Sequence, residues 1–321
     1  CSHPQAGPSI CATSIAKAHT VQRRGGLAAI AENNHVLTLK PNMRAMIDHG
    51  GNPPPSKISI RSASVFPGFC AGHDGQLFRI VEDNDISFTA DEAFLLAYRA
   101  IAYERFAKHW ELRASALHRE FDRGTPFETQ VVVQTQLSAN EYGIRKGLRD
   151  VERWKARYDE RLISGVRSDL HFYAVRFDGL LPIVGCAAFQ PQFDFSGQAL
   201  QRLASSVDEY DHVAMVITSF KGQTVVMLAW VGADQGPAAS FVRSFSSLPD
   251  NRKADAVVRL AFEHTDNVFL KPSWWDGLKR MEQGALLAQS RSGTAARTRS
   301  ANCLTDAGTS YADLPVVREY V

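Results

Sequence analysis

Residues 212–230 have the sequence His-Val-Ala-Met-Val-Ile-Thr-Ser-Phe-Lys-Gly-Gln-Thr-Val-Val-Met-Leu-Ala-Trp, which places two apolar, β-branched runs on either side of Lys221-Gly222. Such runs are typical of buried strands, and a two-residue turn that ends in glycine joins antiparallel neighbours. Two further runs, 171–177 and 180–189, flank Asp178-Gly179 in the same way. We therefore expect two β-hairpins and an antiparallel sheet.

Helices are expected around this sheet. Asp194-Phe-Ser-Gly197 leads into a predicted helix at 198–207, and two more, at about 236–247 and 251–264, should cover one face of the sheet. Pro272 begins the last helix. Beyond about residue 288 the composition turns to Ser, Arg, Ala, Thr and Gly, which predicts a flexible tail.

A long helical hairpin is predicted before the sheet. Apolar residues recur at spacings of three and four from Phe94 to Trp110, so 90–120 should be an amphipathic helix that starts at the capping-box pattern Thr89-Ala-Asp-Glu92. Gly124-Thr-Pro126 ends it, and a second helix is expected from about 127 to 163. We interpret the many charges near the end of the second helix as a solvated face. The pair forms an arm or a spine between domains.

The first part of the chain gives weaker structural signals. Residues 1–24 have no clean periodicity, and a short helix is expected at 27–31 after two glycines. Residues 35–39 and 57–66 alternate like strands, and the proline-rich stretch 42–55 between them predicts an exposed loop.

The expected fold class is therefore α+β, with the long helical hairpin followed by an antiparallel sheet and its covering helices. The predicted domains are an N-terminal metal module (1–88), the helical hairpin (89–164), an antiparallel α+β domain (165–287) and a flexible tail (288–321).

Composition excludes several classes of protein. The 321 residues are 45% hydrophobic with a net charge of +2, so the chain can bury a core and carries no global field for nucleic acid or membranes. Five cysteines, an odd number, argue against a secreted disulfide framework. Because no apolar run reaches about 18 residues and no signal-peptide pattern is present, we expect a cytoplasmic protein without a membrane span.

Metal ligands are concentrated at the N terminus. Three of the five cysteines and five of the ten histidines fall within residues 1–75, which also carry seven Lys/Arg against three acids. Cys70-x-x-His73 has the short spacing of a zinc knuckle, and Cys1 and Cys11 could complete four ligands, with His3 and His19 as competitors. The alternative is that Cys11 and Cys70 are small buried apolar residues and His73 lies at the surface.

Cys1 has three interpretations beside that of a ligand. It could follow a trimmed start, act as an N-terminal nucleophile, or be the lipid-bearing first residue of a mature bacterial lipoprotein.

The pattern Cys…Cys…Ala18-His19-Thr-Val-Gln…Gly-Gly…Cys70-x-x-His73-Asp74 resembles degenerate treble-clef modules of the HNH (ββα-metal) kind. With the distant Pro-x-Trp-Trp, the whole chain is also similar to an uncharacterised group of bacterial proteins. The HNH resemblance implies a treble-clef-like zinc module over residues 1–75, with Cys70 and His73 in its second knuckle. Here His73 replaces the family's Cys, and Asp74 replaces its Asn.

This resemblance implies roles for two catalytic candidates. His19 falls where the family places its general base, which activates water against a phosphodiester, and Asp74 falls where a side chain helps to bind a catalytic divalent ion such as Mg²⁺ or Mn²⁺. The implied function is a metal-dependent nuclease that acts on DNA. The alternative is a non-enzymatic zinc protein whose treble clef and C-terminal domain bind a protein or small-molecule partner.

Three other features are weaker candidates for a functional role. Cys186 lies in an apolar run and is expected to be a buried, inert thiol. Glu263-His264-Thr-Asp266 brings acid and base side chains together at the end of a predicted helix, where such residues usually cap the helix or face water. Trp274-Trp275 should anchor the last helix to the core.

Overall fold

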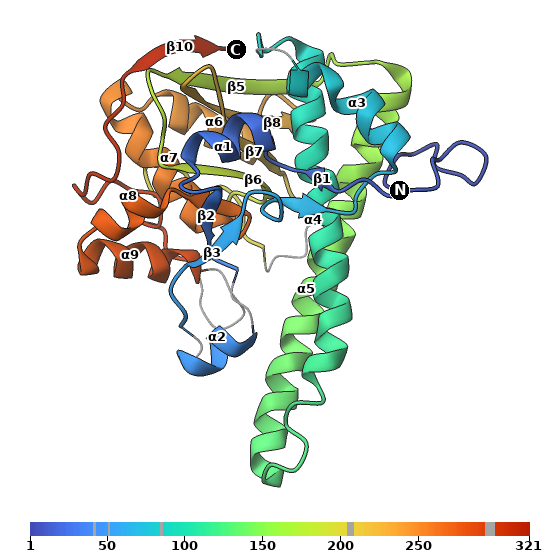
Figure 1. Ribbon diagram of the computed structural model, residues 1–321, viewed down its shortest axis with the longest axis vertical. Helices are drawn as coiled ribbons and strands as arrows, with labels where there is room; N and C mark the ends of the chain where they lie inside the picture. The colour runs from blue at the N-terminus through green and yellow to red at the C-terminus, as the bar shows by residue number, and fades with distance from the viewer. Residues whose placement is uncertain (41–42, 51, 84–85, 204–208, 293–298) are drawn as a thin grey trace.

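The computed structural model describes residues 1–40, 43–50, 52–83, 86–203, 209–292 and 299–321. An eight-stranded antiparallel sheet has long helices against one face and shorter helices against the other (Figure 1), which confirms the predicted α+β class. Among the described helices, none combines the length and the apolar character needed to cross a membrane.

The strands are β1 (Ala18–His19), β2 (His35–Thr38), β3 (Ser56–Ser59), β4 (Val65–Phe66), β5 (Leu170–Phe177), β6 (Ile183–Phe189), β7 (Val213–Phe220), β8 (Gln223–Val231), β9 (Val268–Leu270) and β10 (Val316–Tyr320). The helices are η1 (Arg23–Leu27), α1 (Ala28–Ile30), α2 (Met43–Asp48), α3 (Ala71–Asp83), α4 (Ala90–His118), α5 (Phe127–Ser164), α6 (Pro237–Ser246), α7 (Asp250–His264), α8 (Pro272–Gly277) and α9 (Arg280–Ser290). The large sheet has the order β10-β5-β8-β7-β6-β9-β2-β3, and β1 pairs separately with β4.

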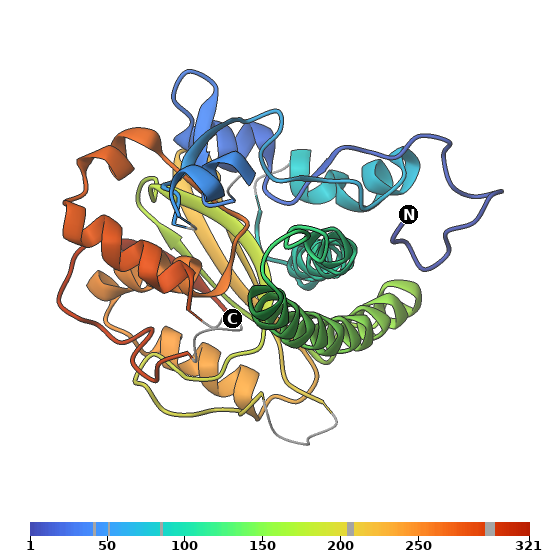
Figure 2. The ribbon, with the colours of Figure 1, turned by 90° about the horizontal axis from the view of Figure 1, so that it is seen from below.

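Alternation along the central strands divides the interior into two cores. In β6, Val184 and Cys186 pack in the core that includes α4, whereas Ile183 and Ala187 pack in the core that includes α6 and α7. Both faces of the sheet are therefore buried, as the continuous apolar runs of the central strands require. Figure 2 shows the sheet between the long helices on one side and the shorter helices on the other.

One of the two predicted hairpins forms. Strands β7 and β8 pair along their length through Lys221 and Gly222, whose φ angles are 48° and 80°, as a tight hairpin turn requires. The prediction that Asp178-Gly179 joins a hairpin was wrong, because β5 pairs with β8 and β10, and β6 pairs with β7 and β9. The β7–β8 hairpin lies between β5 and β6, where both of its edges are covered by neighbouring strands.

The sheet also takes strands from both ends of the chain. β2 and β3 extend it beyond β9, and β10 pairs with β5 at the opposite edge. Instead of a flexible tail, the last residues thus form an edge strand, and Leu304 is fully buried; residues 293–298 of the expected tail lie outside the described residues. Three of the four segments predicted as domains therefore contribute to one sheet.

Two other local predictions were wrong. Residues 198–203 are not helical, because the Asp194 side chain accepts hydrogen bonds from the backbone N–H groups of Ser196 and Gln198 and holds a turn; residues 204–208 of that predicted helix lie outside the described part of the chain. The strand expected at 57–66 ends at Ser59, and Ser64, with a φ of 62°, turns the chain into β4.

The loop expected at 42–55 contains the short helix α2, while residues 41–42 and 51 lie outside the described residues. The short helix predicted at 27–31 and the strand predicted at 35–39 are present as α1 and β2.

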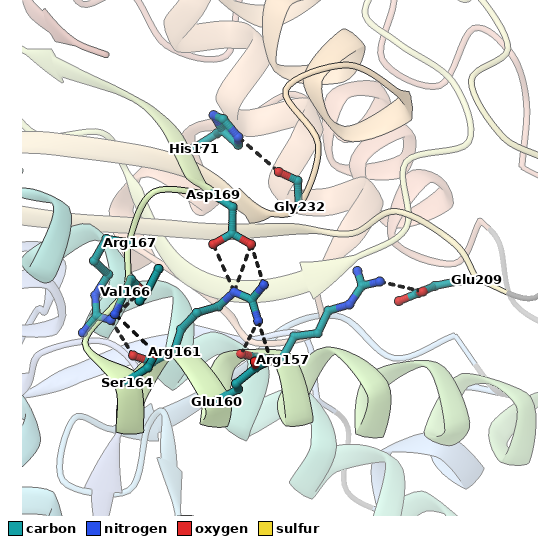
Figure 3. A network of polar contacts seen from close by, with 10 residues as sticks. All are labelled: Arg157, Glu160, Arg161, Ser164, Val166, Arg167, Asp169, His171, Glu209 and Gly232. Atoms are coloured by element: carbon teal, nitrogen blue, oxygen red, sulfur yellow. Dashed lines mark hydrogen bonds and ion pairs between the residues drawn. The ribbon is translucent and has the colours of Figure 1, made fainter.

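Helices α4 and α5 form the predicted hairpin, and the capping box at Thr89 and Glu92 is present. The buried apolar residues of α4 end at Tyr103, and Trp110 is 62% exposed, because the outer halves of both helices project from the body as an arm (Figure 1). At the inner end, Arg161 of α5 binds Asp169 just before β5, and Arg157 binds Glu209 (Figure 3). These ion pairs join the base of the arm to the sheet.

Candidate metal centre and the adjoining histidine

The N-terminal loop is fastened to the chain just before α3 by backbone hydrogen bonds. The N–H of Ser2 donates to the carbonyl of Gly68 at 2.7 Å, and the N–H of Ala16 donates to the carbonyl of Phe69 at 2.9 Å. The side chains of residues 1 and 11 are therefore brought to the first turn of α3.

At this point Cys1, Cys11, Cys70 and His73 come together. The sulfurs of Cys1, Cys11 and Cys70 lie 3.4, 3.8 and 3.2 Å, respectively, from Nδ1 of His73. All four potential ligand atoms lie within 4.8 Å of one another. A tetrahedral zinc ion with ordinary Zn–S and Zn–N bonds would hold sulfur and nitrogen about 3.6 Å apart. The four residues form a group that could hold a metal ion such as zinc, and it is the only such group among the described residues.

The local backbone favours a thiolate at Cys70. The pKa of its thiol is lowered to about 7, chiefly because the backbone N–H of His73 bonds to the sulfur, although burial alone would raise it. The backbone N–H of Cys70 in turn donates to the sulfur of Cys1 at 3.3 Å. Because none of the cysteines is in a disulfide, all three sulfurs are available as ligands.

The two competing histidines lie outside this group. The ring of His3 stacks on that of His73, with centroids 3.9 Å apart and an angle of 4° between the planes. The ring of His19 is held elsewhere, by the backbone. His3 therefore covers the ring of His73 and is not part of the group that could hold a metal ion.

His19 ends β1 and lies opposite Val65 of β4, the strand that leads to Cys70. Its Nδ1 is 3.0 Å from the carbonyl oxygen of Ala63. Since a carbonyl can only accept, Nδ1 carries the proton and Nε2 keeps a free electron pair. Burial lowers the pKa of His19, against the opposing effect of the bond to Ala63, so the imidazole is neutral near pH 7.

Asp74 lies in the first turn of α3, directly after His73. Its Oδ1 is buried and has no hydrogen-bond partner among the described residues. Burial raises the pKa of this carboxyl, with Arg99 acting in the opposite direction. His19 and Asp74 make no hydrogen bond to each other, although the charges of Arg99 and Glu82 act on both.

Sequence reasoning missed Arg99, whose side chain is almost completely buried beside these two residues. Its guanidinium lies 2.7 Å from Oε1 of Glu82 and 4.0 Å from the centroid of the Phe78 ring, and its Nε has no partner among the described residues. An arginine within the apolar stretch 93–103 was the signal that could have identified it, because a buried charge needs a specific partner.

The weaker candidates have structural roles. Cys186 is fully buried, as predicted, and burial raises the pKa of its thiol to about 12. Trp275 is 6% exposed and stacks on Phe262, so it anchors α8 as predicted. Glu263 binds Arg299 through its carboxylate and does not face water.

Comparisons with protein-family models, with curated proteins and with solved structures found no match to the chain. The chemistry of the site is therefore interpreted from its geometry. The Cys3His group is suited to a soft metal ion. Beside it lie the imidazole of His19, the carboxyl of Asp74 with one oxygen that accepts no hydrogen bond from a described residue, and the buried guanidinium of Arg99.

Proposed function

We propose that the protein is a zinc-stabilised, HNH-like phosphodiesterase that cleaves DNA with the help of a second, divalent metal ion. The observation that carries the proposal is the state of His19. It lies on a short strand beside the strand that leads to Cys70 and His73, its tautomer is set by a carbonyl, and its Nε2 is unprotonated.

Zinc fits the Cys3His group by ligand type and spacing. Three sulfurs and one imidazole nitrogen fill a tetrahedral shell, so the ion has no open position for a substrate and would be structural. The treble-clef interpretation is supported by the arrangement of the elements, because two ligands lie at the start of α3, directly after a strand paired with β1.

In the proposed reaction, Nε2 of His19 takes a proton from the water molecule that attacks phosphorus, the bond from phosphorus to the leaving oxygen breaks, and that oxygen takes up a proton from solvent. The unbonded oxygen of Asp74 would hold Mg²⁺ or Mn²⁺, which supplies stabilisation of the developing negative charge. The carbonyl of Ala63 keeps the imidazole in the productive tautomer and stabilises the imidazolium that forms.

The test is a plasmid-cleavage assay with Mg²⁺ or Mn²⁺ on zinc-loaded protein. His19→Ala should lower the rate by at least about 100-fold, the usual contribution of a general base, with an unchanged zinc content by elemental analysis. His35→Ala is the matched control, because Nδ1 of His35 also lies close to a carbonyl, 2.7 Å from that of Asn33, but on an exposed residue of β2. Wild-type protein that carries zinc but cleaves no DNA with either metal would refute the proposal.

A second candidate is a non-enzymatic zinc protein that binds a protein or small-molecule partner. It is favoured by Arg99, because a divalent ion at Asp74 would lie near a buried positive charge. In this case, wild-type and His19→Ala proteins should both bind zinc and neither should cleave DNA. Five cysteines without a disulfide favour a reducing compartment such as the cytoplasm for either function.

A further inference from the structure

A basic surface lies on the arm, on the side of α5 between residues 142 and 153. Here the helix borders a shallow hollow of about 660 Å³. It is lined chiefly by Tyr142, Arg145, Lys146, Arg149, Glu152 and Arg153. We call these residues the basic arm face.

Two cations of this face, Lys146 and Arg149, make no ion pair with an acid among the described residues. Arg149 is exposed and makes no ion pair with any described residue, and the ammonium of Lys146 lies 5.3 Å from the centroid of the Tyr142 ring. Tyr142 itself is 64% exposed. Exposed cations without acidic partners are suited to a polyanion.

The acids nearest to the face are already shared between basic side chains. Glu152 accepts from Arg105 at 2.8 Å and lies 2.9 Å from Nε2 of His109. Glu141 binds both Arg119, at 3.0 Å, and Arg145, at 2.7 Å. Each carboxylate therefore meets more than one basic group, and the surface keeps a net positive charge although the whole chain carries only +2.

We propose that the basic arm face binds the phosphate backbone of duplex DNA. The inference rests on the proposed function, in which DNA is the substrate. Residues 142–153 rise by about 16 Å along the helix, and one DNA strand presents a phosphate about every 3.4 Å. Lys146 and Arg149, the two cations of the face without an acidic partner, thus lie within the length of about five phosphates.

The face is also placed to guide DNA towards the metal module. Two residues beyond Arg153, on a different and buried side of α5, the ammonium of Lys155 donates to the carbonyl of Ser2 at 2.7 Å, next to the proposed ligand Cys1. The inner part of α5 therefore contacts the N-terminal module, and the basic arm face lies on the same helix further out. The arm serves as a binding element and takes no part in bond cleavage.

The test measures binding of a fluorescent 20-base-pair duplex to zinc-loaded protein by anisotropy, without added Mg²⁺ or Mn²⁺, between 50 and 200 mM salt. The double variant Lys146→Gln/Arg149→Gln should bind more weakly, and its slope of log K against log salt should be smaller in magnitude by about 1.8, or about 0.9 per lost contact. The control Lys271→Gln/Arg280→Gln removes the same charge from exposed residues of the α8–α9 region, away from the arm, and should match the wild type (Figure 1).

An unchanged slope in the arm variant would overturn the inference, as would polyglutamate competing as effectively as DNA, which would indicate an acidic protein partner. The two proposals fail separately. DNA binding through the arm without cleavage would refute the nuclease alone, whereas cleavage with an arm-independent salt slope would refute the arm face alone.

Discussion

Loss of the metal should release residues 1–16 while the rest of the protein stays folded. No side chain before Ala18 belongs to either apolar core, so this loop depends on the metal group and a few hydrogen bonds. Ordering sixteen residues costs about 1–2 kcal/mol each, or at least about 16 kcal/mol. The few bonds to the body, such as Ser2 to Gly68 and Lys155 to Ser2, contribute about 1 kcal/mol each. A structural zinc ion at about 10–16 kcal/mol supplies most of the difference.

Cys70→Ser tests this prediction, because it removes a ligand that is fully buried. Zinc should fall from about one ion per chain to none by elemental analysis, and hydrogen exchange of residues 1–16 should become fast. Trypsin should cut after the exposed Lys17 at least about tenfold faster, since cleavage follows the population of the open form. The midpoint of global unfolding should change little.

The control is Cys303→Ser, a half-buried cysteine outside the metal group, which should behave like the wild type. Residues 1–16 that stay protected in zinc-free protein would refute the reasoning. So would unfolding of the whole sheet together with the loop, because it would show that the metal supports the cores.

Two further predictions concern stability. Burial lowers the pKa of His212 to about 3, so the unfolded chain takes up this proton first, and stability should fall as the pH drops below about 6.5. Between pH 7 and 4.5 the wild type should lose about 3 kcal/mol more than His212→Phe in urea unfolding; equal losses would contradict this. Gly222→Ala should destabilise by about 1 kcal/mol, because φ is 80° there, whereas Gly143→Ala on exposed α5 should stabilise by a similar amount in the same assay.

The parts of the fold that the sequence predicts correctly are those decided by neighbouring residues. Thr89 and Glu92 cap α4 through a spacing of three, and Lys221-Gly222 makes its hairpin because only two residues are needed to reverse the chain. The turn at Asp178-Gly179 carries the same local signal, but it does not determine which strands become neighbours. That choice depends on the β7–β8 hairpin, which pairs with β5 along one edge and with β6 along the other and so separates them.

The edge strand β10 could not be predicted for a related reason. Its five residues, Val-Val-Arg-Glu-Tyr, are half-buried or exposed, and the strand is positioned by distant contacts. Tyr320 packs on Phe88 with centroids 4.8 Å apart, and Glu319 accepts from Tyr173 at 2.6 Å. A composition that is typical of a flexible tail thus contains a strand whose pairing partner, β5, lies far earlier in the chain.

The residues of the candidate site also fall into those that local spacing predicts and those that depend on distant contacts. Cys70 and His73 were predictable because their spacing places both on one helical turn, and Cys1 and Cys11 joined them by residue type. Arg99 was not, because its importance arises only when α4 packs against α3 and brings the guanidinium onto Phe78. The effect of Arg99 on His19 and Asp74 is a tertiary property.

The metal group and His19 are held by different contacts, so their roles can be separated by experiment. His19 follows Ala18, which is buried in the core, and the next residue, Thr20, bonds to Ser64 through its N–H at 2.9 Å. Asn267, beside β9, donates to the hydroxyl of Thr20 at 2.7 Å, which ties this strand to the large sheet independently of the metal. Zinc-free protein should therefore keep the bond between His19 and Ala63. If zinc is only structural, Cys70→Ser should retain part of any His19-dependent cleavage, whereas complete loss with the strand still protected would assign the zinc a direct part in the reaction.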